Sequence, residues 1–155
     1  MKYISGMQAL NLPCELVTCG DWHRSGMDWD IPFILESDRS IFGDYGIEHN
    51  KPIPDNPALY SVANHIRACL DLLALEYYDL AQGMKEDLIC TDKYNSEIFE
   101  KVLMMRKLKN WQEINHFMEQ EYRLEWIDFR EDRDGSKKSR KAQTDYPSIF
   151  ERLAR

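Results

Sequence analysis

The sequence lacks a long hydrophobic run. No stretch of its 155 residues approaches the roughly 20 consecutive apolar residues that span a bilayer. The first six residues, from Met1 to Gly6, also lack the continuous apolar core of a secretion signal. We therefore expect a cytoplasmic protein without a membrane partner.

Cysteine is scarce. The four cysteines, Cys14, Cys19, Cys69 and Cys90, are far fewer than a disulfide-dense secreted domain of this length would carry. Cys69 falls on an apolar helix face, where a free thiol behaves as a small hydrophobic group. We therefore expect reduced thiols.

The motifs of nucleotide chemistry are missing too. The sequence contains no Gly-x-Gly-x-x-Gly and no Gly-Lys-Ser/Thr loop, and we interpret the pair Gly43 and Gly46 as part of a turn. No signature of a catalytic cysteine surrounds Cys19, although His23 is near enough to activate its thiol on a turn. We therefore expect neither enzymatic activity nor a cofactor.

Charge is distributed unevenly. The whole chain carries −7, and residues 130–155 hold eight basic against five acidic side chains, a net charge of +3 that leaves −10 for residues 1–129. Residues 1–129 should form one globular domain, followed by a basic tail with a short terminal helix. An acidic body disfavours nucleic acid and favours a basic partner protein, although the charge also serves solubility. Only the basic run 137–141 suits phosphate.

Helical periodicity dominates the second half of the chain. Apolar residues at helical spacing predict an amphipathic helix over 58–75. Two more helices are expected after it, the first capped by Asn95 and the second by Asn110, which forms a capping box with Glu113. The link before the last helix is so short that the two must form an antiparallel hairpin.

The first half predicts a loop-rich layer. Short extended runs occur at Tyr3–Ile4, 10–17 and 31–35, and prolines make 51–57 a stiff extended connector. The predicted fold is mainly α, with α+β as the alternative: a helical hairpin and one further long helix beneath a layer of short strands.

Residues 14–50 are crowded with side chains capable of chemistry, and two metal hypotheses follow. A zinc site would use cysteine and imidazole ligands, here Cys14, Cys19, His23 and His49. A harder cation in a hydrolase or nuclease would use carboxylate and imidazole groups, here Asp21, His23, Asp44 and His49. Neither spacing matches a known motif, so we keep both as alternatives to a metal-free protein.

The same segment is a candidate binding surface. Aromatic side chains on loops with polar neighbours are typical of interaction hot spots, which nominates Trp22, His23, Trp29 and Tyr45. Both tryptophans could instead pack beneath the loop and fix it to the helices. His65, at the margin of a helical apolar stripe, is expected to bond a loop carbonyl.

Three runs carry a family resemblance: residues 19–23, 40–47 and 62–67. They resemble runs in small bacterial proteins from mobile-element or defence loci, some of which lie beside nucleotidyltransferase-type toxins. The resemblance covers residues 1–129 and implies an antitoxin-like or accessory role, with a basic toxin as a possible partner. We accordingly expect a cytosolic, non-enzymatic protein-binding module; self-association remains an alternative.

Overall fold

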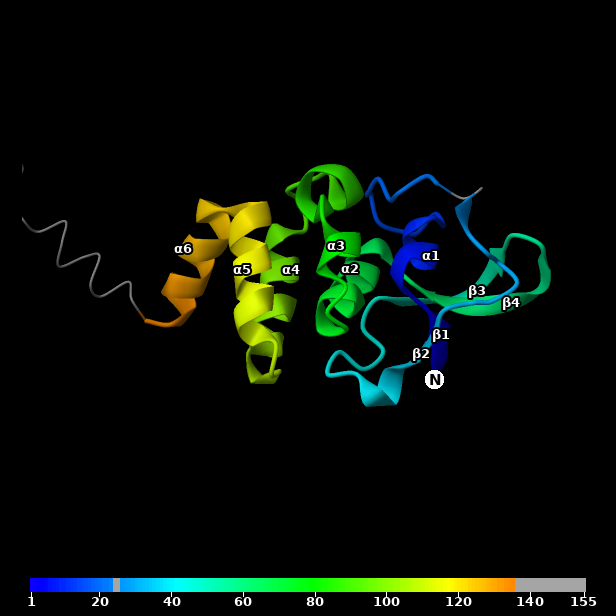
Figure 1. Cartoon of the computed structure of the whole chain (residues 1–155), viewed down its shortest axis with the longest axis horizontal. Helices are drawn as coiled ribbons and strands as arrows, with labels where there is room; N and C mark the ends of the chain where they lie inside the picture. Colours follow the sequence, from blue (N-terminus) through cyan, green and yellow to red (C-terminus); the bar gives the residue numbers. More distant parts are fainter. Residues whose placement is uncertain (24–25, 136–155) are drawn as a thin grey trace, which may run out of the picture.

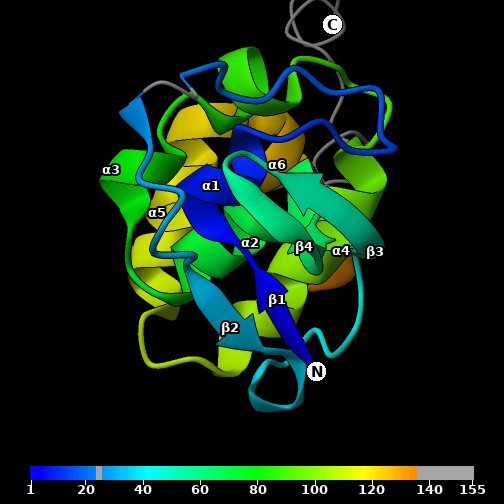
Figure 2. The same cartoon turned by 90° about the vertical axis from the view of Figure 1, so that its right-hand side faces the viewer.

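The protein has an α+β fold in which a small mixed sheet lies at one end (Figure 1). The computed structural model describes residues 1–23 and 26–135. The sheet has the order β2-β1-β4-β3, with strands β1 (Lys2–Ile4), β2 (Ile34–Glu36), β3 (Ile47–Ile53) and β4 (Asn56–Ala63). β1 pairs antiparallel with β2 and parallel with β4, while β3 and β4 form an antiparallel hairpin. Figure 2 views this end of the molecule, with the strands in front of the helices.

The helices extend away from the sheet. In chain order they are α1 (Gly6–Leu10), the short η2 (Ser37–Arg39), α2 (His65–Ala74), α3 (Tyr78–Ala81), the π-helix η3 (Met84–Ile89), α4 (Asn95–Met104), η4 (Met105–Lys107), α5 (Trp111–Tyr122) and α6 (Leu124–Arg133). In Figure 1, α1 lies beside the sheet, α2 and α3 occupy the middle, and α4 to α6 form the opposite end. The described helices include none that is long and apolar enough to cross a membrane.

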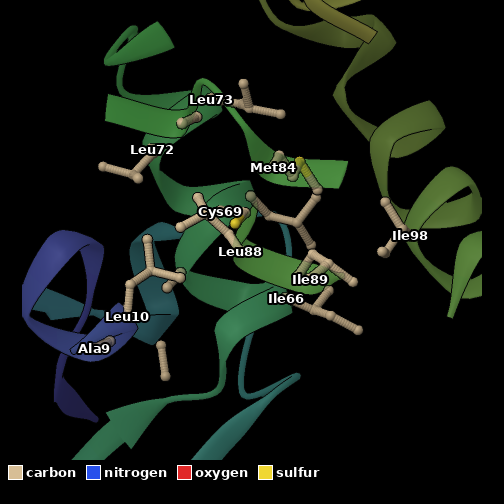
Figure 3. Packing of buried hydrophobic residues seen from close by; sticks show 14 of the residues in the cluster. Ala9, Leu10, Ile66, Cys69, Leu72, Leu73, Met84, Leu88, Ile89 and Ile98 are labelled. Atoms are coloured by element: carbon tan, nitrogen blue, oxygen red, sulfur yellow. The ribbon is translucent and has the colours of Figure 1, made fainter. Parts of the chain in front are cut away.

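Helix α2 is the centre of the core. Asn64 caps its first turn, because the side chain accepts a hydrogen bond from the backbone N–H of Arg67. All but the last of its residues are buried, and α1 packs on one side while η3 packs on the other. Figure 3 shows Cys69 of α2 between Leu10 of α1 and Met84 of η3. The helix also buries three polar side chains, His65, Arg67 and Asp71, which therefore need hydrogen-bond partners inside the protein.

Aromatic rings hold the three C-terminal helices together. Phe99 of α4 meets the edge of Tyr122 at 5.0 Å between ring centroids and Trp126 at 5.5 Å. Phe99 lies in the middle of α4 and Tyr122 ends α5, so the rings join the two helices, and their antiparallel hairpin stays a prediction. Phe129 of α6 completes the cluster, with its ring edge-to-face with Phe99 and stacked on Trp126, and such aromatic pairs contribute about 0.5–1.5 kcal/mol each beyond burial.

The predicted helix over 58–75 is half wrong. Its first part is strand β4, and only His65–Ala74 is helical. The apolar residues from 59 to 66 satisfy a helical spacing, but the residues up to Ala63 pair with β1 and β3 as a strand. The helix begins only after Asn64, which caps it. The stiff connector 51–57 is likewise part of the β3–β4 hairpin and its turn.

Among the other local predictions, some are confirmed and some are wrong. Tyr3–Ile4 is a strand, as predicted, and 31–35 overlaps β2, whereas the run 10–17 follows α1 as a loop instead of a strand. Asn110 is the N-cap residue of α5, as predicted, but its side chain makes no capping hydrogen bond; Asn95 lies inside α4, whose N-cap residue is Tyr94. Asn110 donates to the carbonyl of Leu73 and to the Tyr78 hydroxyl, a tertiary use of an amide at a helix start.

The start of the predicted tail belongs to α6, which continues through residue 129 as far as Arg133. Arg130 donates to the Asn115 side chain and to Glu119 of α5 at 2.7 and 3.0 Å, which ties this helix to the body. The basic run 137–141 and the predicted terminal helix lie outside the described residues.

The expectation of reduced thiols is corrected at two positions. Cys19 and Cys90 form a disulfide that links the loop after α1 to the end of η3. Cys69 is a buried free thiol in the core, as predicted, and Cys14 is a half-buried free thiol. The spacing of the cysteines did not indicate this pairing, since the two partners are 71 positions apart.

Candidate functional site

The two predicted metal sets do not converge. Cys19 is bonded to Cys90, so its sulfur is not available as a thiolate ligand. His23 pairs with Asp21, at 3.1 Å between Nδ1 and Oδ2. His49 lies on β3, where its Nδ1 is 3.0 Å from the Ser61 hydroxyl. Across residues 1–23 and 26–135, no three His, Cys, Asp or Glu side chains are placed to hold a metal ion.

The four predicted binding residues have different environments. Trp22 is 70% exposed and the His23 side chain is 78% exposed, so both are available to a partner. Trp29 is buried, which is the packed arrangement considered for the tryptophans. Tyr45 is half-buried, with its ring 4.1 Å from the Lys101 ammonium and its hydroxyl enclosed. The exposed part of this surface is therefore confined to residues 22–23.

A thiol, a hydroxyl and an imidazole converge beside this loop. The Thr18 hydroxyl lies 2.7 Å from Nδ1 of His65 and 3.5 Å from Sγ of Cys14. The other ring nitrogen of His65 is 2.7 Å from the Leu12 carbonyl, which confirms the predicted bond to a loop carbonyl. The imidazole is buried at the start of α2, whereas Cys14 is half-buried on the loop.

The electrostatics of this cluster favour charge separation. Burial opposes ionisation of Cys14, but hydrogen bonds from His65 and Thr18 outweigh it and lower the pKa of the thiol to about 7. The pKa of His65 is raised: burial works against its charge, while the Cys14 thiolate and the Leu12 carbonyl favour it. A thiol with this pKa is substantially ionised near neutrality.

Gly20 makes the close approach possible. It adopts φ +75°, and a Cβ there would lie 2.6 Å from the Leu10 carbonyl oxygen and 2.9 Å from the His65 ring. Only glycine allows the loop to pass so near the imidazole. No pattern in the sequence connects Cys14, Thr18 and His65, because Thr18 and His65 are 47 positions apart and only loop closure brings them together.

An acidic groove lies elsewhere, between α3 and α5. A hollow of about 620 Å³ joins a second of about 600 Å³ beside η3, with Asp79, Gln82, Gln120 and Glu121 common to both. The carboxylates that line this acidic groove are Asp79, Glu86, Asp87, Glu113 and Glu121. Arg123 is the one cationic side chain among the described lining residues.

The acidic groove combines unpaired charge with an aromatic wall. Asp79 and Glu113 are exposed and form no ion pair with a described residue, and the half-buried rings of Tyr78 and Phe117 lie beside them. Burial raises the pKa of Tyr78, the hydrogen bond with Asn110 opposes this rise, and the nearby carboxylates of Glu76 and Glu113 add to it. Sequence reasoning found the acidic body but not this local concentration.

A third hollow, of about 640 Å³, adjoins the edge strand β2. Its wall includes three partly exposed aliphatic side chains: Ile34, Ile41 and Leu75. Its lining also includes Tyr3 and Asp71, which belong to a buried polar network, so its shape depends on that network.

No known family model matches this sequence, and neither the curated proteins nor the solved structures contain a significant match to it. The function must therefore be argued from the geometry of these sites.

Proposed function

We propose that this protein is a non-enzymatic protein-binding module whose acidic groove accepts a basic segment of another protein. The observation that carries the proposal is the concentration of five carboxylates around a hollow with only one opposing cationic side chain among its described lining residues. Complementary charge steers association and selects partners more than it supplies raw affinity.

The aromatic wall would supply the affinity that charge alone lacks. Tyr78 and Phe117 present half-buried rings between exposed polar side chains, and exposed Tyr77 and Leu80 lie on and beside the same short helix α3. Aromatic anchors surrounded by a polar rim are the usual composition of a binding hot spot. A basic segment with an apolar side chain therefore fits both features of the acidic groove.

The carboxylates also indicate what this surface does not bind. Nucleic-acid backbones and other polyanions are repelled by such a field, because phosphate affinity depends on lysine and arginine. The runs at 19–23, 40–47 and 62–67 that resemble proteins of mobile-element and defence loci support an antitoxin-like or accessory role. A basic toxin in the cytoplasm is then the partner to test first.

Charge reversal in the acidic groove should abolish partner capture. The double variant Asp79→Lys/Glu113→Lys changes two exposed carboxylates that have no described ion-pair partner, so folding should be unaffected. Opposing like charges in an interface cost several kcal/mol, so we expect at least about a tenfold loss of affinity. The measurement compares proteins retained from a native-host lysate by wild-type and variant protein, followed by titration of the identified partner.

The matched control is Glu15→Lys/Asp30→Lys, which changes the net charge equally at two exposed positions remote in sequence from the groove. A basic protein retained by wild type and control, released by salt and lost from the groove variant supports the proposal. Equal capture by the groove variant, or no protein captured at all, refutes it. Loss of capture only on Trp22→Ala would move the binding surface to the N-terminal loop.

A further inference from the structure

We propose that Cys14 is a covalent modification site, whose thiolate exchanges with low-molecular-weight disulfides by passing its proton through Thr18 to His65. This inference is independent of the acidic groove. It rests on three side chains in a row, with the Thr18 hydroxyl between sulfur and imidazole, 3.5 Å from Sγ and 2.7 Å from Nδ1.

The hydrogen-bond partner of the far ring nitrogen fixes the direction of the relay. A backbone carbonyl only accepts, so Nε2 of His65, 2.7 Å from the Leu12 oxygen, must carry a hydrogen. In the neutral ring Nδ1 is then the acceptor, and it receives the Thr18 hydroxyl. The hydroxyl oxygen in turn is free to accept the thiol hydrogen of Cys14.

Ionisation moves one proton along each link. The thiol proton passes to the Thr18 oxygen as the hydroxyl proton passes to Nδ1, which leaves a thiolate, a neutral hydroxyl and an imidazolium. The Leu12 carbonyl and the nearby Glu48 carboxylate stabilise the positive ring. The pKa of Cys14, lowered to about 7, agrees with this arrangement.

The other cysteines cannot do the same chemistry. Cys69 is fully buried, and burial raises the pKa of its thiol, so it is neither ionised nor accessible. Cys19 and Cys90 are already bonded to each other. Cys14 lies between exposed Pro13 and Glu15, where a small disulfide can reach it.

The exchange balances without a further reactant. The Cys14 thiolate attacks one sulfur of the incoming disulfide, a mixed disulfide forms, and the original S–S bond breaks. The departing sulfur takes the bonding electron pair and leaves as a thiolate, which takes a proton from water or from the imidazolium. Cys14 is oxidised, and half of the incoming disulfide is reduced.

The test follows the reaction of the full-length protein with an aromatic disulfide, measured as released thiolate between pH 5 and 10. We expect one rapid equivalent with a midpoint near the Cys14 pKa of about 7, and peptide mapping should place the adduct on Cys14. Glutathione disulfide should form the same adduct.

Thr18→Val removes the link between sulfur and imidazole together with one of the hydrogen bonds that lower the pKa of the thiol, so the midpoint should rise above about 7, in the direction of the ordinary thiol value of about 9. A full return to that value would slow the reaction at pH 7 about sixfold, because fewer thiolates are offset in part by a stronger nucleophile. Thr18→Ser should keep the low midpoint, as should Thr91→Val, a matched threonine substitution beside Cys90.

Two results would overturn the proposal. A wild-type midpoint near 9, unchanged in Thr18→Val, would mean that the cluster does not activate the thiol. An adduct on Cys90 with a new Cys14–Cys19 bond would mean that Cys14 attacks the internal disulfide instead.

Discussion

Reduction of the Cys19–Cys90 disulfide should lower the free energy of unfolding by about 4 kcal/mol. The bond closes a loop across 71 positions, and the chain-entropy relation for a loop of that length gives this magnitude. In the folded state the bond reinforces a backbone contact, since the N–H of Gly20 donates to the Leu88 carbonyl at 2.9 Å. Reduction should therefore loosen the N-terminal loop before it affects the helices.

The measurement is thermal and chemical unfolding with and without a phosphine reductant. For a chain of this length, 4 kcal/mol corresponds to a fall in Tm of roughly 8 to 16 °C. Cys19→Ser/Cys90→Ser should show the lower Tm and no longer respond to the reductant, whereas Cys14→Ser should respond as wild type does. Alkylation of all four cysteines in the unreduced protein, with no Tm change on reduction, would contradict the disulfide.

The bond also bears on the proposed cytoplasmic role. Cytoplasmic thiols are kept reduced, so a disulfide there is usually transient or responsive to redox state. Cys14 and Trp22 lie on the loop that Cys19 anchors, and both would gain freedom on reduction. The stability experiment thus also measures how strongly the exposed loop depends on redox conditions.

The helices that the sequence predicts best are those in which the spacing of apolar side chains within the segment is enough to determine its secondary structure. In α4 and α5 the buried apolar residues at helical spacing, such as Phe99 and Met118, face the core, as the periodicity predicts. In β4, by contrast, Leu59 and Val62 satisfy a helical spacing but are held as strand by pairing with β3 and β1. Pairing with strands that are distant in the sequence overrides such a local pattern, and the spacing of apolar residues does not reveal that pairing.

The sites were less predictable than the fold, for the same physical reason. Each joins residues that loop closure, not periodicity, brings together: Cys14 with His65, Cys19 with Cys90, and α3 with α5. The segment 14–50 supplies Cys14 and Thr18 to the cluster at His65. Its histidines and aspartates, however, are dispersed over the loop, the turn after η2 and strand β3.

Removal of Arg67 should have the other large effect. Its guanidinium is fully buried and bonded at every edge: to Asp71 at 3.0 Å, to the Tyr3 hydroxyl at 2.8 Å and to the carbonyls of Gly43 and Tyr45. Asp71, also buried, accepts hydrogen bonds from Tyr3 and from Ser5 at 2.6 Å. The network joins α2 to β1 and to the turn before β3.

Arg67→Met should therefore lower the free energy of unfolding by about 3–5 kcal/mol, because it leaves the buried Asp71 carboxylate without a counter-charge. Asp71→Leu should lower the free energy of unfolding by a similar amount, because it leaves the buried guanidinium of Arg67 without its carboxylate partner. The double variant should lose much less than the sum of the two, since replacing a buried pair with apolar side chains removes both desolvation penalties. Urea unfolding of the four proteins measures this coupling.

The exposed ion pair between Arg39 and Glu36, 2.9 Å apart, is the matched control. Arg39→Met should change stability by less than about 1 kcal/mol, as surface pairs do. If Arg67→Met were equally mild, the guanidinium would have to be hydrated in solution, and the turn at 43–45 would not depend on it. The same network contributes Tyr3 and Asp71 to the hollow beside β2. A large loss of stability in Arg67→Met would therefore show that the shape of this hollow depends on the buried ion pair.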